Sequence, residues 1–212
     1  MRLTVCGATG GTGVHVVRQA LDAGHEVTAV VRDPARLPGD LRDRATVVTA
    51  DVLDPAAIEP AIKERDAVVS ALGPRGRGPS TVCADGIRAI STAAASTGVR
   101  RVVLVSASGL AADAGDGPFT RYVVKPLLLE RILHGPFEDM RAAEAHLRGT
   151  DLDWTIVRPP QLLDKPAKGT YRKAVDLAVR GGLRIPRADL ATALLDVLAD
   201  GRTVGHVISV AT

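Results

Sequence analysis

Three glycines near the start of the chain, Gly7, Gly10 and Gly13, have the surroundings of a nucleotide phosphate site. They lie between a short apolar run, 3–6, and the segment 14–21, whose apolar residues recur at helical spacing. Gly7 can form the tight turn out of a strand, Gly10 lets a pyrophosphate approach the backbone, and Gly13 allows close packing of helix on strand. The free N–H groups in the first turn of that helix would then face the phosphates.

The glycine spacing is GxxGxxG, whereas the usual dehydrogenase fingerprint is GxGxxG. No Lys-Ser/Thr pair follows the last glycine, so the segment is not a P-loop. A glycine-rich turn can also be only a turn. Because this one lies at the first strand–helix junction, a dinucleotide site is favoured, with these candidate phosphate contacts: Gly7, Thr9, Gly10, Gly11, Thr12 and Gly13.

An arginine follows the second predicted strand, 26–31. At this strand end, dinucleotide folds use an acidic residue for the 2′-OH of NAD or an arginine for the 2′-phosphate of NADP. Arg32 therefore predicts NADP(H). Arg36 could close on the same phosphate or remain a solvated surface residue. Asp33 directly before Pro34 is typical of a helix N-cap instead.

Further candidate ligand contacts follow three later strands, expected at 46–50, 67–73 and 101–105. Asp51 and Val52 could receive the adenine amino group and ring. Arg75, in a loop of glycine, proline and arginine, is the better candidate for the pyrophosphate, and Arg77 is expected to be solvated. Ser106 could hydrogen-bond a substrate carbonyl or a nicotinamide amide, or only satisfy local backbone.

Apolar runs alternate with helical patterns along the whole chain. Strands are expected at 3–6, 26–31, 46–50, 67–73, 101–105, 153–157, 169–175 and 205–210. Helices are expected at 14–21, 55–63, 80–97, 119–133, 137–148 and 187–198, with Asp54 capping the second and Gly98 closing the third. This order favours an α/β fold, a Rossmann-like doubly wound parallel sheet with helices on both faces. The 212 residues fit a single domain, with substrate-side elements from about 107–135 and 158–186.

Composition bears on partners and location. No uncharged run approaches the ~18 residues of a membrane span. Basic residues are dispersed along the sequence and aromatics make up 2% of it, which disfavours nucleic-acid binding. The N-terminus enters the first strand directly, so a cytoplasmic location is expected. The two cysteines indicate no disulfide framework and the five histidines no metal site. We expect a small-molecule substrate and a monomer or weak homodimer.

Several motifs together carry a family resemblance. They are Gly7 to Gly13, Val31-Arg32-Asp33-Pro34, Arg36-Leu37, Asp51-Val52, Leu72-Gly73, Ser106, Thr155-Ile156-Val157-Arg158-Pro159-Pro160 and Asp189-Leu190-Ala191. Across essentially its whole length, the chain resembles atypical short-chain dehydrogenases/reductases of the NAD(P)-binding, NmrA-like group. It is most similar there to the biliverdin-IXβ reductase/flavin reductase family.

The resemblance implies an NADP(H) site. The implied contacts, ordered from the 2′-phosphate to the nicotinamide, are Arg32, Arg36 with Thr12 beside them, Asp51, Val52, Leu72, Gly73, Arg75, Ser106 and Pro160. These are the positions that strand-end chemistry also suggests, so NADPH is the expected cofactor.

The chain departs from the superfamily in its catalytic pair. Ordinary members use Tyr-x-x-x-Lys, in which the tyrosine gives a proton to a carbonyl and the lysine lowers its pKa. The matching positions here are Phe137 and Arg141, and a phenyl ring cannot transfer a proton. Tyr122 and Lys125 are one residue too close, which puts them on different helix faces.

Gln161 follows the paired prolines, where the flavin reductase branch has a histidine. An amide can orient a ligand but cannot serve as an acid, so Ser106 and Gln161 remain the candidate catalytic residues. The pattern predicts NADPH-dependent hydride transfer to a flavin, quinone or related planar conjugated acceptor. The alternatives are a non-catalytic NADP(H)-sensing regulator similar to NmrA, or a reductase or epimerase on another carbonyl or nucleotide-sugar substrate.

Overall fold

The computed structural model describes residues 1–74, 76, 78–109 and 134–212. Its main sheet consists of eight strands in the order β3-β2-β1-β4-β5-β6-β10-β8. The strands are β1 (Arg2–Cys6), β2 (Glu26–Val31), β3 (Thr46–Thr49), β4 (Ala67–Ser70), β5 (Arg101–Val105), β6 (Asp153–Arg158), β8 (Arg172–Val175) and β10 (His206–Ala211). Every neighbouring pair is parallel except β10 with β8. The predicted doubly wound sheet is therefore confirmed, with one antiparallel strand at its edge.

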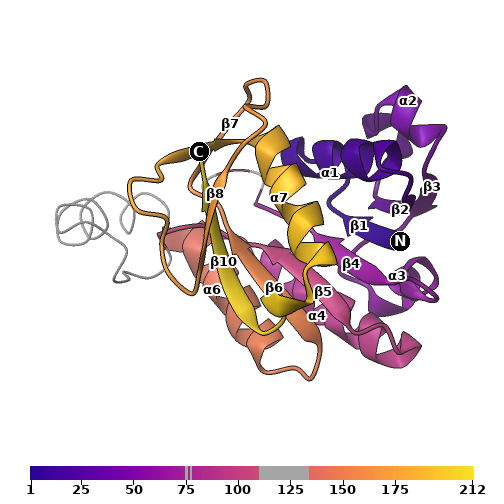
Figure 1. Cartoon of the computed structure of the whole chain (residues 1–212). Coiled ribbons are helices and arrows are strands. Elements are labelled where there is room, and N and C mark those ends of the chain that lie inside the picture. The colour runs from indigo at the N-terminus through magenta and orange to yellow at the C-terminus, as the bar shows by residue number, and fades with distance from the viewer. Residues whose placement is uncertain (75, 77, 110–133) are drawn as a thin grey trace.

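Helices cover both faces of this sheet (Figure 1). On one face α1 (Gly11–Asp22) packs against α7 (Arg187–Ala199), and on the other α4 (Val82–Thr97) packs between α3 (Pro55–Ile62) and α6 (His134–Arg148). Alternate residues of β1 serve the two cores, with Leu3 and Val5 in one and Cys6 in the other. This alternation is expected of a strand that is buried on both faces.

Short elements complete the fold. They are η1 (Pro34–Arg36), α2 (Gly39–Arg42), η3 (Gly201–Thr203), and the strands β7 (Gln161–Leu163) and β9 (Arg184–Pro186). Strands β7 and β9 form a separate parallel pair that the sequence does not predict, because three residues are too few to show a period. The helix expected at 119–133 lies outside the described residues.

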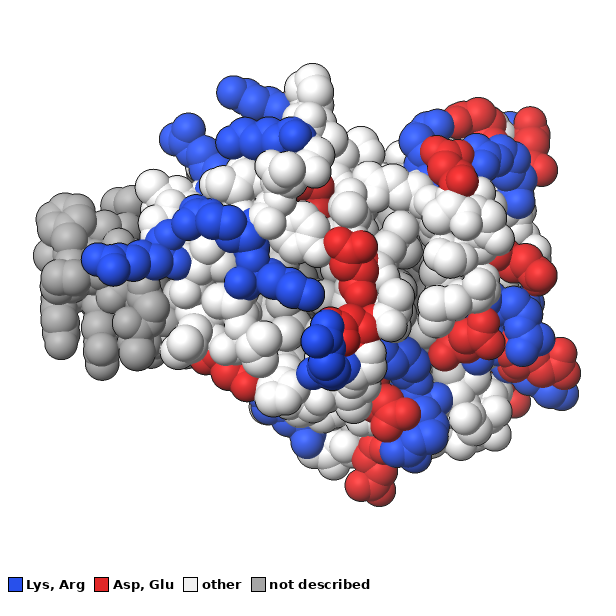
Figure 2. Space-filling model, viewed as in Figure 1, with Lys and Arg blue, Asp and Glu red and all other residues white. Residues whose placement is uncertain are grey.

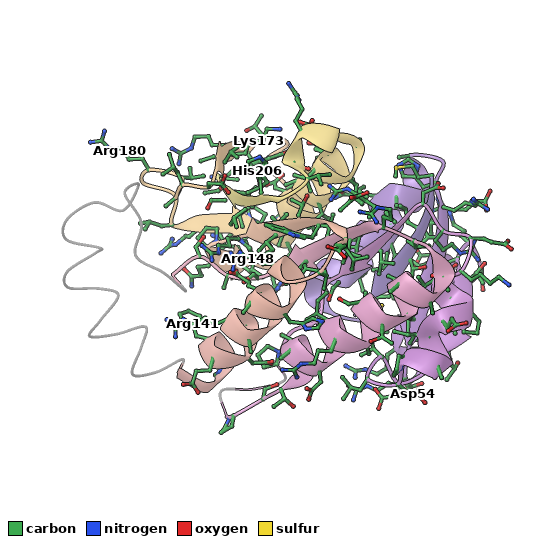
Figure 3. The ribbon with its side chains drawn as sticks, turned by 90° about the horizontal axis from the view of Figure 1, so that it is seen from below. Asp54, Arg141, Arg148, Lys173, Arg180 and His206 are labelled. Carbon is green, nitrogen blue, oxygen red and sulfur yellow. The ribbon has the colours of Figure 1, made fainter. Side chains whose placement is uncertain are left out.

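Helix ends follow the predicted capping residues. The Asp54 carboxylate accepts hydrogen bonds from the backbone N–H of Ala56 and Ala57 at 3.0 and 3.2 Å, at the start of α3 (Figure 3). Gly98 ends α4 with φ +74°. Asp33 likewise accepts from the N–H of Ala35, although the element that it caps is the 3-10 turn η1. These local signals are confirmed because each depends on neighbouring residues only.

The N-terminus of α4 is capped from a distant element. The Asp139 carboxylate of α6 is buried and accepts hydrogen bonds from the N–H groups of Cys83 and Ala84 at 3.0 and 2.8 Å. A carboxylate at this end also complements the helix dipole. Asp139 thereby joins α6 to α4 beside the carboxyl end of the sheet.

Candidate cofactor-binding site

A cavity of about 890 Å³ opens at the carboxyl ends of β1, β2, β4 and β5. The strand order reverses between β1 and β4, and this switch point is where open α/β sheets bind ligands. The volume lies in the range of small-molecule and cofactor sites.

The glycine turn at the end of β1 forms the floor of the cavity. Gly7 has φ +82°, and a Cβ there would lie 2.6 Å from the carbonyl oxygen of Ala71. A Cβ on Gly13 would lie 2.1 Å from the carbonyl oxygen of Gly7, so only glycine lets α1 pack so closely on the turn. The tight turn and the close packing that the sequence predicts are both confirmed.

The first turn of α1 faces the cavity. Gly10 precedes this helix without a capping side chain, and Thr9, Gly10, Gly11 and Thr12 all line the cavity. The N–H groups of a first helical turn have no partner within the helix. They form an anion site together with the positive end of the helix dipole. Gly13 is part of the packing contact and does not line the cavity.

One end of the cavity has the residues predicted for the adenosine. Arg32 and Arg36 both line it and are exposed, and the turn η1 places Arg36 one turn beyond the end of β2. Asp51 and Val52 line the same cavity after β3. Asp51 also accepts a hydrogen bond from the N–H of Leu53 at 3.1 Å, so its carboxylate is held in a turn.

The middle of the cavity is lined by Leu72 and Gly73, which follow β4. Arg75, the third residue predicted for this stretch, lies outside the described residues. Ser106 lines the opposite part of the cavity, directly after β5, and is only 4% exposed. The predicted cofactor contacts from 7 to 106 that the structure describes therefore surround one cavity, except Gly13.

A buried carboxylate holds the Ser106 hydroxyl. Ser106 Oγ donates a hydrogen bond to Glu144 Oε1 at 2.6 Å, and Glu144 on α6 is 2% exposed. Arg158 donates to both carboxylate oxygens, Nε to Oε1 at 2.8 Å and Nη2 to Oε2 at 2.5 Å. Arg148 donates to Oε2 at 2.9 Å. The network joins β5, α6 and β6 behind the cavity wall.

The ionisation of Glu144 fixes the polarity of Ser106. Burial raises the pKa of the Glu144 carboxyl, but hydrogen bonds from Arg158 and Ser106 and the charges of Arg158 and Arg148 outweigh it, so the net pKa is lowered. A carboxylate accepts only, so Ser106 must donate its proton to it. The lone pairs of Ser106 Oγ are then left for the cavity, and the serine acts there as an acceptor. Sequence reasoning missed this because Glu144 is distant along the chain.

The remaining catalytic-side candidates lie away from the cavity lining. Gln161 begins β7 and is exposed, and neither it nor Pro160 lines the cavity. Phe137 is 6% exposed in the core, and Arg141 projects outward from α6 (Figure 3). The residues of α6 and β7 that line the cavity are instead Met140 and Leu162. Neither side chain carries a sequence signal for binding.

Positive charge is less dispersed than the sequence suggests. Figure 2 shows Lys and Arg side chains gathered over β7, β8 and their loops, whereas both signs mix around α2. We call residues 165–187 the basic segment. Its basic residues are Lys165, Lys168, Arg172, Lys173, Arg180, Arg184 and Arg187. Arg187 is the member that lines the cavity, and sequence reasoning did not identify it.

The chain matches a family model described as NAD(P)H-binding over residues 7–201. This chain belongs to the NAD(P)H-binding family. Its predicted cofactor class is thereby confirmed, and the cavity fits it: a helix N-terminus without a side-chain cap, a glycine turn with no room for side chains, and arginines after β2.

Solved structures of similar proteins confirm the fold of this NAD(P)H-binding protein. A short-chain dehydrogenase/reductase from Veillonella parvula in complex with NADP is 22% identical, with a TM-score of 0.84 over 100% of this chain and 94% of that one. A protein from Burkholderia pseudomallei is 27% identical, with a TM-score of 0.82 over all of both chains. An anaerobillin reductase from Escherichia coli O157:H7 is 23% identical, with a TM-score of 0.75 over 100% and 97%.

Neither a membrane-spanning helix nor a metal-binding cluster is found in the described residues of this NAD(P)H-binding chain. No helix there is long and apolar enough to cross a membrane. Within the same ranges, no group of three or more His, Cys, Asp or Glu residues could hold a metal ion.

We predict that acid weakens the fold through Glu144. Its folded-state pKa lies below the ordinary 4.5, so the unfolded chain takes up this proton first as pH falls. The stabilisation is complete above the ordinary value and is lost as pH falls through the folded-state pKa. In urea unfolding, the free energy of unfolding of wild type should therefore exceed that of Glu144→Gln by less and less as pH falls from about 6 to 3.

The control for this measurement is Glu26→Gln, which changes an exposed carboxylate at the start of β2. Its difference from wild type should stay small throughout. If the difference in free energy of unfolding between wild type and Glu144→Gln does not change with pH, Glu144 is not ionised in the folded protein.

Proposed function

We propose that the protein is an NADPH-dependent oxidoreductase that transfers a hydride to a flavin, a quinone or a related planar conjugated acceptor. One observation supports this most: the described residues that line the cavity include no tyrosine, histidine, lysine or cysteine, and its two carboxyl side chains, Asp33 and Asp51, follow β2 and β3 at the adenosine end. Carbonyl reduction needs such a group to protonate the developing alkoxide. A planar conjugated acceptor takes the hydride at an electrophilic ring atom and draws its proton from water.

Bound NADPH supplies the hydride, and the protein supplies position. We propose that Ser106 contributes by accepting a hydrogen bond from the carboxamide N–H of the nicotinamide. Its hydroxyl hydrogen is already donated in the hydrogen bond to Glu144, so it is poorly suited to donate to a substrate carbonyl. Gln161 is exposed at the start of β7, where its amide could contact an acceptor that extends beyond the cavity.

The apolar part of the lining favours a flat partner. Val105, Met140 and Leu162 line the cavity together with Ser106, and no aromatic side chain stands among the described lining residues. An acceptor would therefore lie on the nicotinamide ring and on aliphatic side chains. Such an arrangement fits an acceptor that binds briefly and leaves, rather than a tightly held flavin.

The preference for NADPH over NADH rests on the arginines at the adenosine end of the cavity. Arg32 and Arg36 line the cavity, and the described residues make no ion pair with either guanidinium. Two arginines at the end of β2 match a 2′-phosphate, which only NADP(H) carries. The basic segment over β7 and β8 adds long-range attraction for an anionic cofactor (Figure 2).

The proposal predicts turnover with planar acceptors. Purified protein mixed with NADPH and FMN, riboflavin or a quinone should oxidise NADPH faster than the spontaneous reaction, followed at the nicotinamide absorbance. Phe137→Tyr is the matched variant, and it should leave the rate nearly unchanged because no side-chain acid is required. NADPH binding without turnover on any planar acceptor would contradict the proposal and favour an NADP(H)-sensing protein. A rate that Tyr122→Phe abolishes would favour carbonyl chemistry.

The proposal also predicts how Arg32 selects the cofactor. Arg32→Ala should weaken NADPH far more than NADH, because the lost charge-assisted hydrogen bonds are worth about 1.5–3 kcal/mol and reach a group that NADH lacks. Dissociation constants from fluorescence titration measure both. Arg42→Ala, an exposed arginine of α2 that does not line the cavity, is the control. Equal losses for NADPH and NADH would show that Arg32 does not contact the 2′-phosphate.

A further inference from the structure

The side chain of Arg187 extends from the start of α7 to the start of α1. Arg187 is the first residue of α7, and its side chain lies against the first turn of α1. A Cβ added to Gly11 would lie 3.0 Å from both Cδ and Nε of Arg187. Arg187 Nη1 lies 3.5 Å from Thr12 Oγ1, and the side chain is 27% exposed at the edge of the cavity. The guanidinium is thus held beside the N–H groups that form the anion site.

This position is unfavourable for a cation unless an anion joins it. The N-terminus of α1 carries the positive end of the helix dipole, which repels a guanidinium. Among the described residues, one carboxylate balances Arg187: Nε donates to Asp164 Oδ1 at 2.7 Å. Asp164 is 84% exposed, and a pair with so exposed a partner is worth only about 0–1 kcal/mol.

The pairing leaves donors of Arg187 available. A guanidinium has five N–H groups in a planar fork that suits two oxygens of one phosphate. The ion pair with Asp164 uses Nε, and the contact of Nη1 with Thr12 is at the limit of a hydrogen bond. No described residue accepts a hydrogen bond from Nη2.

We propose that Arg187 is a ligand of the cofactor pyrophosphate and exchanges Asp164 for the phosphate oxygens when the dinucleotide binds. The phosphates would then be held between the N–H groups of α1 and the Arg187 fork. The pyrophosphate is common to NADP(H) and NAD(H), so this contact adds affinity for both, whereas Arg32 distinguishes them. The inference rests on membership of the NAD(P)H-binding family and not on the proposed hydride acceptor.

The proposal also assigns a role to Gly11. The predicted glycine pattern of the fold uses positions 7, 10 and 13, and Gly11 lies outside it. A side chain at Gly11 would press on the Arg187 stem, so glycine here keeps the guanidinium close to the phosphates. Because Arg187 follows β9 directly, cofactor binding would also fix the β7–β9 pair that the sequence did not predict.

Calorimetric dissociation constants for NADP⁺ and NAD⁺ test this without any turnover. Arg187→Ala should weaken both cofactors by the same factor, about 10- to 100-fold, as expected for a lost charge-assisted contact. Asp164→Asn should strengthen both by up to about fivefold, because it removes the competing carboxylate. Arg184→Ala is the matched control, since Arg184 is an exposed arginine of β9 that does not line the cavity.

Three outcomes would overturn the proposal. Unchanged affinity in Arg187→Ala would exclude a contact with the cofactor, and a loss confined to NADP⁺ would move that contact to the 2′-phosphate. An equal loss in Arg184→Ala would show only the general effect of positive charge. Arg187→Lys keeps the charge without the fork and should fall between wild type and Arg187→Ala, so it replaces the alanine variant if that fails to fold. Binding data leave the hydride proposal untouched, so the two can fail separately.

Discussion

The close contact between α1 and the turn after β1 is the constraint on which the site depends. With only 2.1 Å between a would-be Cβ of Gly13 and the carbonyl oxygen of Gly7, the helix is seated directly on the strand end. This seating brings the unpaired N–H groups of the first turn to the switch point between β1 and β4. The ends of β2, β3, β4 and β5 then place their side chains around the same point.

A second constraint acts at the other end of the cavity. Glu144 is buried, and its carboxylate accepts hydrogen bonds from Arg148, Arg158 and the Ser106 hydroxyl. Removing an arginine partner leaves the buried Glu144 carboxylate less compensated, which destabilises the fold. The network therefore leaves Ser106 Oγ as a hydrogen-bond acceptor towards the cavity, so the ligand must offer a donor there. The amino-acid composition alone does not show this requirement. It also joins β6 and α6 to the strand that carries the serine.

The sequence was informative wherever a short segment decides the outcome. Gly7, Gly13 and the caps Asp33 and Asp54 depend on neighbours along the chain and are found as predicted. The apolar strands are also found, although β4 ends three residues before its expected end and β8 begins three residues after its expected start. The placement of Arg32 and Arg36 at one cavity also followed, because parallel strands end at one edge of a sheet.

The contacts that could not be predicted from the sequence join residues that are distant along the chain. Ser106 with Glu144, Asp139 with the start of α4, and Arg187 with Gly11 are set by helix packing, which no local pattern encodes. Gln161 illustrates the converse. It follows a recognisable motif, yet its side chain lies outside the cavity lining because the chain turns into the short strand β7 there.

A crystal structure of the protein with NADP⁺ bound would test these contacts directly. We expect the pyrophosphate on the N–H groups of Gly11 and Thr12, the 2′-phosphate on Arg32, and the carboxamide N–H on Ser106 Oγ. A 2′-phosphate that faces solvent, or a dinucleotide bound away from the turn after β1, would show that these strand ends do not form one NADP(H) site.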